Sequence, residues 1–281
     1  MPVSELHRRI AAVVLSAAGA YGFALGGGNA LLAYGVISRP TQDVDLFTDR
    51  EDGVAAAAGS VEAALRGAGF EPERQDQVTG LVDLFPDMGE GLAEWIVTGP
   101  DGAQIVLQLA YFDRGRDPVV MDVGPVLDLE DVVGGKICAL ASRVEPRDYA
   151  DVAAVLEHYS PAQLIGFARR LDPGLTGQDF AEAGLRLDRM DDRVFAGIGL
   201  NRHDVARLRE RLAAWPRSAR EADWEVSLGK PSGHPTAPGG TPVASMPEPD
   251  TREPDRAGGR QQQTRSGSAA QPERDDPEAE P

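Results

Sequence analysis

Residues 22–47 read GFALGGGNALLAYGVISRPTQDVDLF, and the first expectations about the architecture come from this segment. The apolar run at 21–25 stops at three glycines, which predicts a short strand and a tight turn. A short helix is expected over 29–34, closed by Gly35. The run DVDLF at 43–47 alternates polar and apolar residues, which predicts a half-buried strand. The segment therefore predicts a mixed α/β unit.

Asp43 and Asp45 are the residues of this segment that point most directly to a function. Residues i and i+2 of a strand point to the same face, so the two carboxylates lie together, about 7 Å apart at their backbones. Mg²⁺ prefers oxygen ligands and is often held by one or two carboxylates together with substrate phosphates. An ordinary solvated strand face is the alternative, although Val44 and Leu46 already supply an opposite apolar face.

The glycines Gly26, Gly27 and Gly28 form a weaker signal. A glycine turn between a strand and a helix lets backbone N–H groups approach phosphate oxygens, but a plain tight turn has the same sequence. The run is not the dinucleotide-binding fingerprint, because Leu31 occupies its sixth position. The segment around Lys136 is not a phosphate-binding P-loop either, because Ile137 stands where Ser or Thr is required.

A second charged cluster falls on two predicted helices, 129–143 and 147–159. Helical spacing places Lys136 near the middle of the apolar face of the first helix, and Asp148 and Asp151 on the apolar face of the second. A buried ammonium needs an anionic partner. These residues therefore indicate either a functional cleft or an internal ion-pair network, such as Lys136 with Asp151, and Asp148 alternatively suits the first turn of a helix.

The rest of the chain completes an α+β organisation: a mixed sheet with flanking helices, a helical C-terminal part and a disordered tail. The domains are expected at 1–127, 128–228 and 229–281. Further helices are expected at 4–20, 53–68, 161–170, 178–187 and 203–214, and β-like runs at 80–85, 93–98 and 103–111. Ten of the 21 prolines fall within 231–281, where large apolar side chains are nearly absent.

Composition excludes several classes of protein. The chain has 281 residues, one cysteine and a net charge of −17, so an intramolecular disulfide and a multi-cysteine zinc site are excluded. The acidic balance disfavours broad, non-specific adhesion to nucleic acid. No run approaches the roughly 20 apolar residues of a membrane span, and the N-terminus suits an amphipathic helix better than a signal peptide. A cytoplasmic location is expected.

Three motifs in this order carry a resemblance: GGGNAL at 26–31, RPTQDVDLF at 39–47, and Lys136-x-x-Ala-Leu-x-x-Arg143 followed by Arg147-Asp148-x-x-Asp151. Together they resemble the AbiEii/AbiGii-type toxin nucleotidyltransferases of type IV toxin–antitoxin systems, relatives of the DNA polymerase β-like nucleotidyltransferases. The resemblance spans residues 22–159.

The resemblance implies a Mg²⁺-dependent transfer of a nucleotide from a nucleoside triphosphate to an acceptor hydroxyl. The acceptor would be an RNA, with the tRNA 3′ end as the expected site, and a cognate antitoxin would be encoded nearby. The site residues it implies are Gly26, Gly27, Gly28, Arg39 and Thr41 for substrate, Asp43 and Asp45 for Mg²⁺ and catalysis, and Lys136, Asp148 and Asp151 as further catalytic residues.

Gln108 lies in the strand expected over 103–111. Nucleotidyltransferases of this superfamily usually carry a third carboxylate on such a later strand, so Gln108 departs from their pattern. Glutamine neither accepts a proton as a base nor contributes charge to a metal. Either Asp148 or Asp151 then takes the base role, or catalysis is weakened. Two alternatives remain: a nucleotidyltransferase acting on a small molecule such as an aminoglycoside, and a degenerate nucleotide-binding protein acting through partners.

Overall fold

The structure is a computed structural model that describes residues 5–75, 91–143, 145–213 and 215. The chain divides into two compact units, 1–240 and 241–281, and every described residue belongs to the first. The predicted tail and the β-like run at 80–85 lie outside the described residues. The domain boundaries after residues 127 and 228 remain a prediction.

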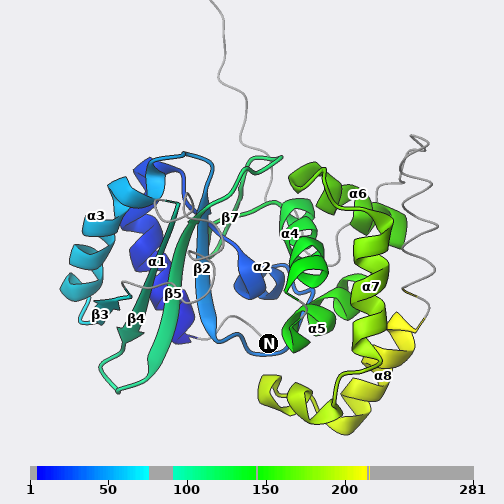
Figure 1. The fold of residues 1–281 in the computed structure, drawn as a ribbon. Helices are drawn as coiled ribbons and strands as arrows, with labels where there is room; N and C mark the ends of the chain where they lie inside the picture. Colours follow the sequence, from blue (N-terminus) through cyan, green and yellow to red (C-terminus); the bar gives the residue numbers. More distant parts are fainter. Residues whose placement is uncertain (1–4, 76–90, 144, 214, 216–281) are drawn as a thin grey trace, which may run out of the picture. The chain divides into compact units, whose positions relative to one another are not determined.

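The first part of the unit combines helices and short strands (Figure 1). Its elements are α1 (Glu5–Ala18), the 3₁₀ helix η1 (Gly19–Tyr21), β1 (Ala24–Leu25), α2 (Gly27–Ala33), β2 (Asp43–Thr48), α3 (Gly53–Gly67), β3 (Glu71–Arg74), β4 (Leu92–Thr98), β5 (Gln104–Tyr111), β6 (Val119–Met121) and β7 (Gly124–Val126).

The strands form a seven-stranded mixed sheet in the order β3-β4-β5-β2-β1-β7-β6. Strands β2 and β5 pair in parallel, with Asp45 opposite Gln108, and β4 runs antiparallel to β5, with Glu94 opposite Gln108. The expected mixed sheet is therefore confirmed, and the register places these three polar side chains in one row across its centre.

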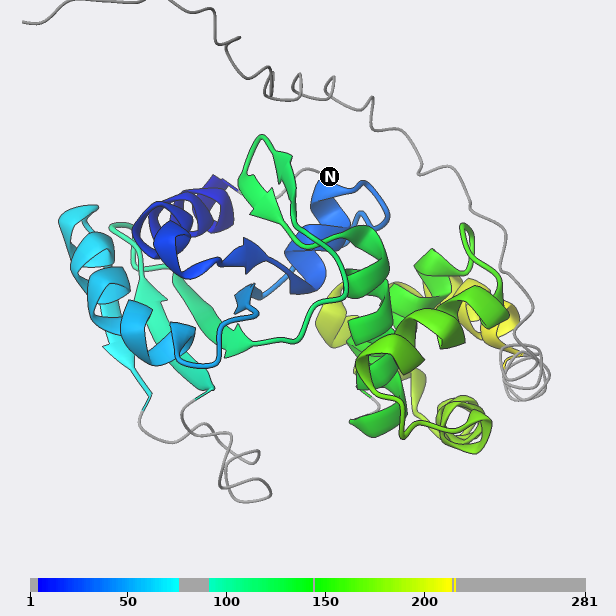
Figure 2. The same cartoon turned by 90° about the horizontal axis from the view of Figure 1, so that it is seen from above.

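The two faces of the sheet differ in what covers them. Val44 and Leu46 are fully buried on the face that α1 and α3 cover. The opposite face carries Asp43 and Asp45, both partly exposed, and lies toward α2 and the helical part of the unit (Figures 1 and 2). The alternation predicted for β2 thus separates a packed face from an open one.

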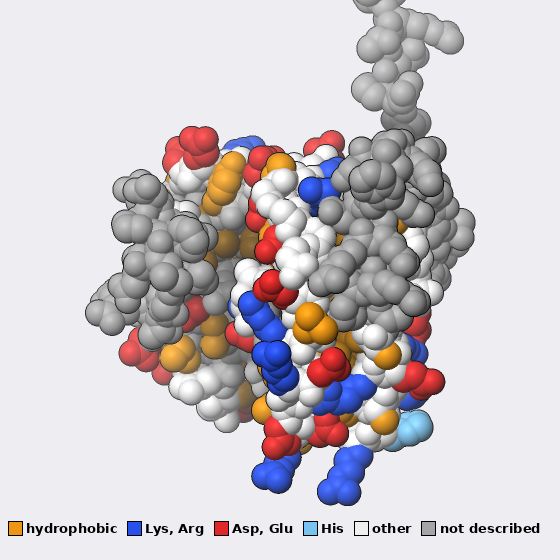
Figure 3. Space-filling model, turned by 45° about the vertical axis from the view of Figure 1, so that its right-hand side comes forward, with side chains coloured by type: hydrophobic (Ala, Val, Ile, Leu, Met, Phe, Trp, Pro, Cys, Tyr) orange, Lys and Arg blue, Asp and Glu red, His pale blue; other side chains and the backbone are white. Residues whose placement is uncertain are grey.

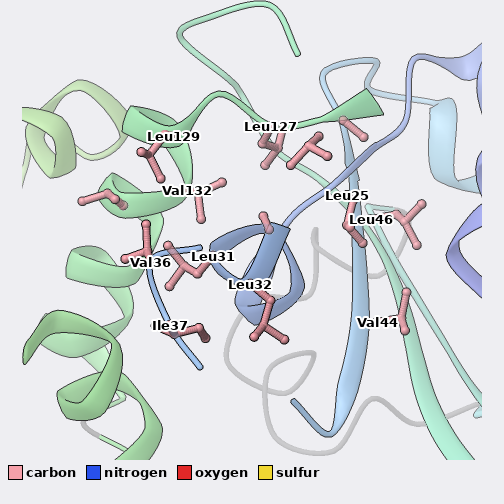
Figure 4. Packing of buried hydrophobic residues seen from close by; sticks show 14 of the residues in the cluster. Leu25, Leu31, Leu32, Val36, Ile37, Val44, Leu46, Leu127, Leu129 and Val132 are labelled. Carbon is pink, nitrogen blue, oxygen red and sulfur yellow. The ribbon is translucent and has the colours of Figure 1, made fainter. Parts of the chain in front are cut away.

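Helix α2 joins the open face of the sheet to the helical part. Its residues Leu31 and Leu32 are buried, and Figure 4 shows them between the labelled residues of β2, such as Leu46, and those of α4, such as Val132. Helices α2 and α4 contact each other directly. This packing fixes the glycine turn, which begins α2, against the carboxylates of β2.

The helical part is organised around α4. Its elements are α4 (Leu129–Ser142), α5 (Pro146–Val155), α6 (Pro161–Leu171), α7 (Gly177–Leu187), the 3₁₀ helix η3 (Asp192–Ile198) and α8 (Arg202–Leu212). Helix α4 contacts α5, α6 and α7, while α5 contacts α8. The side chains of Ser160, Thr176 and Asn201 cap α6, α7 and α8, each within a capping box that fixes the start of the helix.

The largest differences from the expected elements are at short segments. The strand expected over 21–25 is reduced to β1, because Gly19–Tyr21 forms a 3₁₀ turn and Gly22 adopts a φ of 73°. The helix expected over 147–159 ends at Val155, five residues before Ser160, which caps the next helix. Strands β3, β6 and β7 were not predicted, because each has only three or four residues.

Candidate active site

A cavity of about 810 Å³ opens between the uncovered face of the sheet and the helical part. A volume of this size suits a ligand the size of a nucleotide. The predicted site residues that line it are Gly27, Gly28, Arg39, Thr41, Asp43, Asp45 and Lys136. The cavity therefore brings together the strand carboxylates, the glycine turn and the lysine of α4.

At each of the three glycines of the turn, a side chain from β2 or from the loop before β2 lies so close that a Cβ atom on the glycine would clash with it. A Cβ atom at Gly27, whose φ is +59°, would lie 1.8 Å from Asp45 Oδ2. A Cβ at Gly26 would lie 2.3 Å from the Phe47 ring, and one at Gly28 would lie 2.6 Å from Thr41 Cγ2. The turn thus forms a cradle for the Asp45 carboxylate that any larger residue would fill.

Asp43 and Asp45 share the open face of β2 but have different partners. Asp43 Oδ2 lies 2.7 Å from Arg147 Nη1. Burial raises the pKa of Asp45 to about 7, and the neighbouring charge of Asp43 adds to the rise, whereas the positive charges of Lys136, Arg147 and Arg143 oppose it. Asp45 therefore binds a proton more readily than an ordinary aspartate, whereas Asp43 has a direct cationic partner.

This donor set fits one hard divalent cation. The two carboxylates supply oxygen ligands on one face, and the Gly27 cradle leaves no side chain between the turn and Asp45. Across residues 5–75, 91–143 and 145–213, no group of three or more His, Cys, Asp or Glu side chains could hold a metal. Substrate oxygens would thus have to complete the coordination.

Asn29 ties the loop before β2 to the turn. Its Nδ2 donates to the backbone oxygen of Asp43 at 2.7 Å, and its Oδ1 accepts a hydrogen bond from Thr41 Oγ1 at 2.9 Å. The predicted substrate-binding residue Thr41 therefore lies at the cavity wall, with its hydroxyl engaged in this structural bond. The role of Asn29 was not predicted from sequence, although it follows the glycines directly.

Asp151 holds two cations at the cavity wall. Its side chain is fully buried, its Oδ1 lies 2.6 Å from Arg39 Nη2 and 3.0 Å from Arg39 Nε, and its Oδ2 lies 2.9 Å from Lys136 Nζ. The ion pair of Lys136 with Asp151, one of the alternatives drawn from the helical pattern, is thus present. One anion between two cations leaves a local excess of positive charge facing the cavity.

Asp148 does not line the cavity. Its side chain is fully buried and accepts two hydrogen bonds from Arg143, to Oδ2 at 3.1 Å and to Oδ1 at 2.9 Å, and one from the backbone N–H of Glu145 at 3.1 Å. The last bond belongs to the capping box that begins α5. These contacts suit a residue that fixes α5 and Arg143, and a base role for either Asp148 or Asp151 stays a prediction.

Glu94 was not predicted from sequence as part of the site. Gln108 Nε2 donates to Glu94 Oε2 at 2.6 Å. Because a carboxylate only accepts hydrogen bonds, this contact fixes which end of the amide faces Glu94 and turns the Gln108 carbonyl oxygen away from it. A negative charge therefore does lie near the expected third position, one strand farther out.

Two further cavity residues, Arg143 and Arg147, were quoted in the sequence motif without a role. Both line the cavity from the end of α4 and the start of α5. Their position in the sequence close to Asp148, a predicted site residue, could have identified them as site residues. Figure 3 shows basic and acidic side chains mixed over the face that it presents, rather than a broad basic surface.

Cys138 also borders the cavity, but it is not a nucleophile at neutral pH. Burial raises the pKa of its thiol to about 12, and its Sγ donates to the backbone oxygen of Ala168 at 3.5 Å. The thiolate is the reactive form of cysteine, so this side chain is a packing residue. The carboxylates, the lysine and the arginines of the cavity therefore remain the candidates for the chemistry of the site.

Solved structures with a TM-score of 0.50 share the fold at low sequence identity. The structure of JHP933 from Helicobacter pylori is 14% identical, with a TM-score of 0.50, over 81% of this chain and 100% of that one. The nucleotidyltransferase toxin MenT4 from Mycobacterium tuberculosis H37Rv is 16% identical, with a TM-score of 0.49, over 79% of this chain and 92% of that one. No curated protein matches the chain.

No helix among the described residues is both long and apolar enough to cross a membrane. The sequence matches the family described as nucleotidyl transferase AbiEii toxin, type IV TA system, over residues 12–237, which is most of the chain. Membership implies a nucleoside triphosphate as substrate and a cognate antitoxin. The match includes the glycine turn, both strand carboxylates and the charged helices α4 and α5, and the chain accordingly belongs to the AbiEii family of nucleotidyltransferase toxins.

Proposed function

We propose that the cavity binds a nucleoside triphosphate with Mg²⁺ at Asp43 and Asp45 and transfers its nucleotide to the 3′-terminal hydroxyl of a tRNA. The observation that carries the proposal is that one cavity joins a partly neutralised carboxylate pair to two cations, Arg39 and Lys136, held by a single buried anion. Phosphoryl-type transfer depends on such positioning and charge neutralisation more than on covalent participation by the protein.

The residues on the open face of the sheet would hold the metal. Asp43 and Asp45 would provide two oxygen ligands, and the carbonyl oxygen of Gln108, next to Asp45 in the sheet, would provide a neutral one. When bound, Mg²⁺ supplies positive charge that stabilises the oxygens of the reacting phosphate. The Gly27 cradle keeps the Asp45 carboxylate in place before any ligand enters.

The two cations that Asp151 binds, Arg39 and Lys136, would hold the triphosphate. Arg39 and Lys136 come from segments 97 residues apart in sequence, and Asp151 fixes both. Preorganised donors stabilise charge that develops on a leaving pyrophosphate without having to reorient during the reaction. Asp151 is therefore assigned as a positioning residue, and the acceptor hydroxyl would enter on the side of the strand carboxylates.

The acceptor is the least constrained part of the proposal. Support for tRNA comes from the resemblance to this toxin class, and growth inhibition would be the outcome of the modification. The net charge of −17 indicates that RNA contact would be local and dependent on bound cations rather than spread over the surface.

Incubation of the full-length protein with each of the four α-³²P-labelled nucleotides, total tRNA and Mg²⁺ tests the proposal. Label in tRNA that disappears with Asp43→Asn and Lys136→Ala is expected, while the matched control Asp52→Asn, an exposed acid before α3, keeps it. Growth arrest on expression that survives Asp45→Asn would contradict an enzymatic toxin.

The same assay separates the alternatives. Label that enters an aminoglycoside or another small hydroxyl compound, and not tRNA, would indicate a small-molecule nucleotidyltransferase. Nucleotide binding without any transfer would indicate a degenerate protein that acts through partners, for which Gln108 in place of an acid is the supporting feature.

A further inference from the structure

Arg147 contacts Asp43 at the carboxylate where a metal cation would be expected to bind. Its Nη1 lies 2.7 Å from Asp43 Oδ2, and its Nε lies 2.7 Å from Glu145 Oε2. One guanidinium therefore bridges a strand carboxylate and a second acid at the start of α5. Among the described residues, no other hydrogen bond to the Asp43 carboxylate is present.

The local structure makes this contact easy to exchange. Glu145 is the N-cap of α5 and Pro146 is its first residue, so Arg147 lies in the first turn, where the helix dipole disfavours a positive charge. Its side chain is 29% exposed at the cavity wall. Two acidic partners, Asp43 and Glu145, bind it there.

We infer that Arg147 substitutes for the metal at Asp43 in the ligand-free protein and, when the metal–nucleotide complex binds, releases Asp43 and binds a phosphate oxygen. This inference rests on the proposed function. Glu145 would stay bound to Nε of Arg147, so the Nη atoms of Arg147 would remain at the cavity edge. These atoms would exchange the Asp43 carboxylate for a phosphate oxygen. No covalent bond is made or broken in this exchange.

The physical reason lies in the charge balance of the site. Two carboxylates on one strand face repel each other, and Arg147 offsets only one of the two charges. A divalent cation would displace it, but the displaced guanidinium loses a strong acceptor unless a phosphate replaces Asp43. Metal and nucleotide are therefore expected to strengthen each other's binding, and Arg147 is the residue that couples them.

Binding of Mn²⁺, followed by electron paramagnetic resonance with and without a non-hydrolysable nucleoside triphosphate analogue, tests this exchange. Arg147→Gln should bind Mn²⁺ about 3- to 10-fold more tightly than wild type without nucleotide, because the competing cation is gone. It should bind the analogue about 10-fold more weakly in the presence of Mn²⁺, because one phosphate donor is lost. A purely structural role would not move the two affinities in opposite directions.

Arg143→Gln is the matched control, since it removes an equal charge from the same cavity but leaves the contact between Arg147 and Asp43 intact. An equal gain of Mn²⁺ affinity in both variants would show a general charge effect and overturn the inference. Unchanged Mn²⁺ affinity in Arg147→Gln, including no binding in either protein, would also overturn it. Circular dichroism melting confirms that each variant is folded.

Asp43→Asn separates this inference from the proposed function. If Asp43→Asn abolishes Mn²⁺ binding while wild type and Arg147→Gln bind equally, the metal site stands and the exchange fails. If Asp43→Asn binds Mn²⁺ as wild type does, the metal site itself is wrong.

Discussion

Two pairs of aspartates serve the same cavity in opposite ways. Asp43 and Asp45 lie two residues apart on strand β2, and Asp148 and Asp151 lie three residues apart on helix α5, so each spacing places both carboxylates on one face. The helix pair is fully buried, with two hydrogen bonds to Asp148 from Arg143 and two cations on Asp151. The Asp43 side chain is 20% exposed and contacts one arginine.

The difference shows that partners, and not residue type, decide what a carboxylate does. A buried charge without a partner is very unfavourable, so the helix pair exists only together with its cations and holds them in place. The two strand carboxylates have one ion-pair partner among the described residues, Arg147 on Asp43, and they lie at a cavity wall, which suits a ligand that brings positive charge. The comparison supports the proposal that the helix pair positions cations and that the strand pair binds one.

The largest expected effect is on activity at the strand pair. Asp45→Asn should lower the rate of nucleotide transfer at least about 10⁴-fold, since it removes half of the charge that would hold the metal. The melting temperature should stay the same or rise, because an unneutralised charge is lost. Steady-state transfer and a thermal melt measure both, and Asp52→Asn serves as the matched control. A large loss of stability would contradict the contrast with the helix pair.

The helix pair should show the reverse pattern. Asp151→Asn should lower the free energy of unfolding by about 3–5 kcal/mol, because it leaves Arg39 and Lys136 at a buried site without their shared anion. Urea denaturation measures this change.

Asp148→Asn is the control for that substitution. It should cost about 1–3 kcal/mol, because Arg143 is 43% exposed and water can solvate it. Full stability of Asp151→Asn together with complete loss of transfer would make Asp151 a catalytic residue instead of a positioning one.

Local patterns in the sequence were enough to predict much of this architecture. The alternation in 43–47 predicted both the strand and its two faces, and α3 and α4 begin at the expected residues. The spacing of Lys136 and Asp151 on their helices predicted either a cleft or an ion pair, and the structure contains the ion pair. These features depend on periodicity within one element, which a sequence displays directly.

Features that depend on two distant elements could not be predicted in this way. Arg147 meets Asp43 across 104 residues, and the bond of Gln108 to Glu94 depends on the register of two strands. The edge strand β3, with sequence EPER, has no apolar alternation to distinguish it from a loop. Its pairing with β4 alone makes it a strand.

The smallest expected effect concerns pH and the strand pair in the metal-free protein. The pKa of Asp45 is raised to about 7 in the folded chain, against 3.8 for an ordinary aspartate, so the folded state binds more protons than the unfolded state between these values. The free energy of unfolding should therefore fall as pH rises from about 4 to about 7, by at most about 1.4 kcal/mol per pH unit from this group.

Urea denaturation at several pH values measures this slope against Asp45→Asn, which lacks the titrating group and should show a flatter dependence. Asp43→Asn sharpens the test: removal of the neighbouring negative charge lowers the pKa of Asp45 in the folded chain, so the fall in stability should still begin near pH 4 but end at lower pH and be smaller in total. Equal slopes in wild type and Asp45→Asn would mean that the strand carboxylates are as well neutralised as those of the helix, and the distinction between the two pairs would then rest on geometry alone.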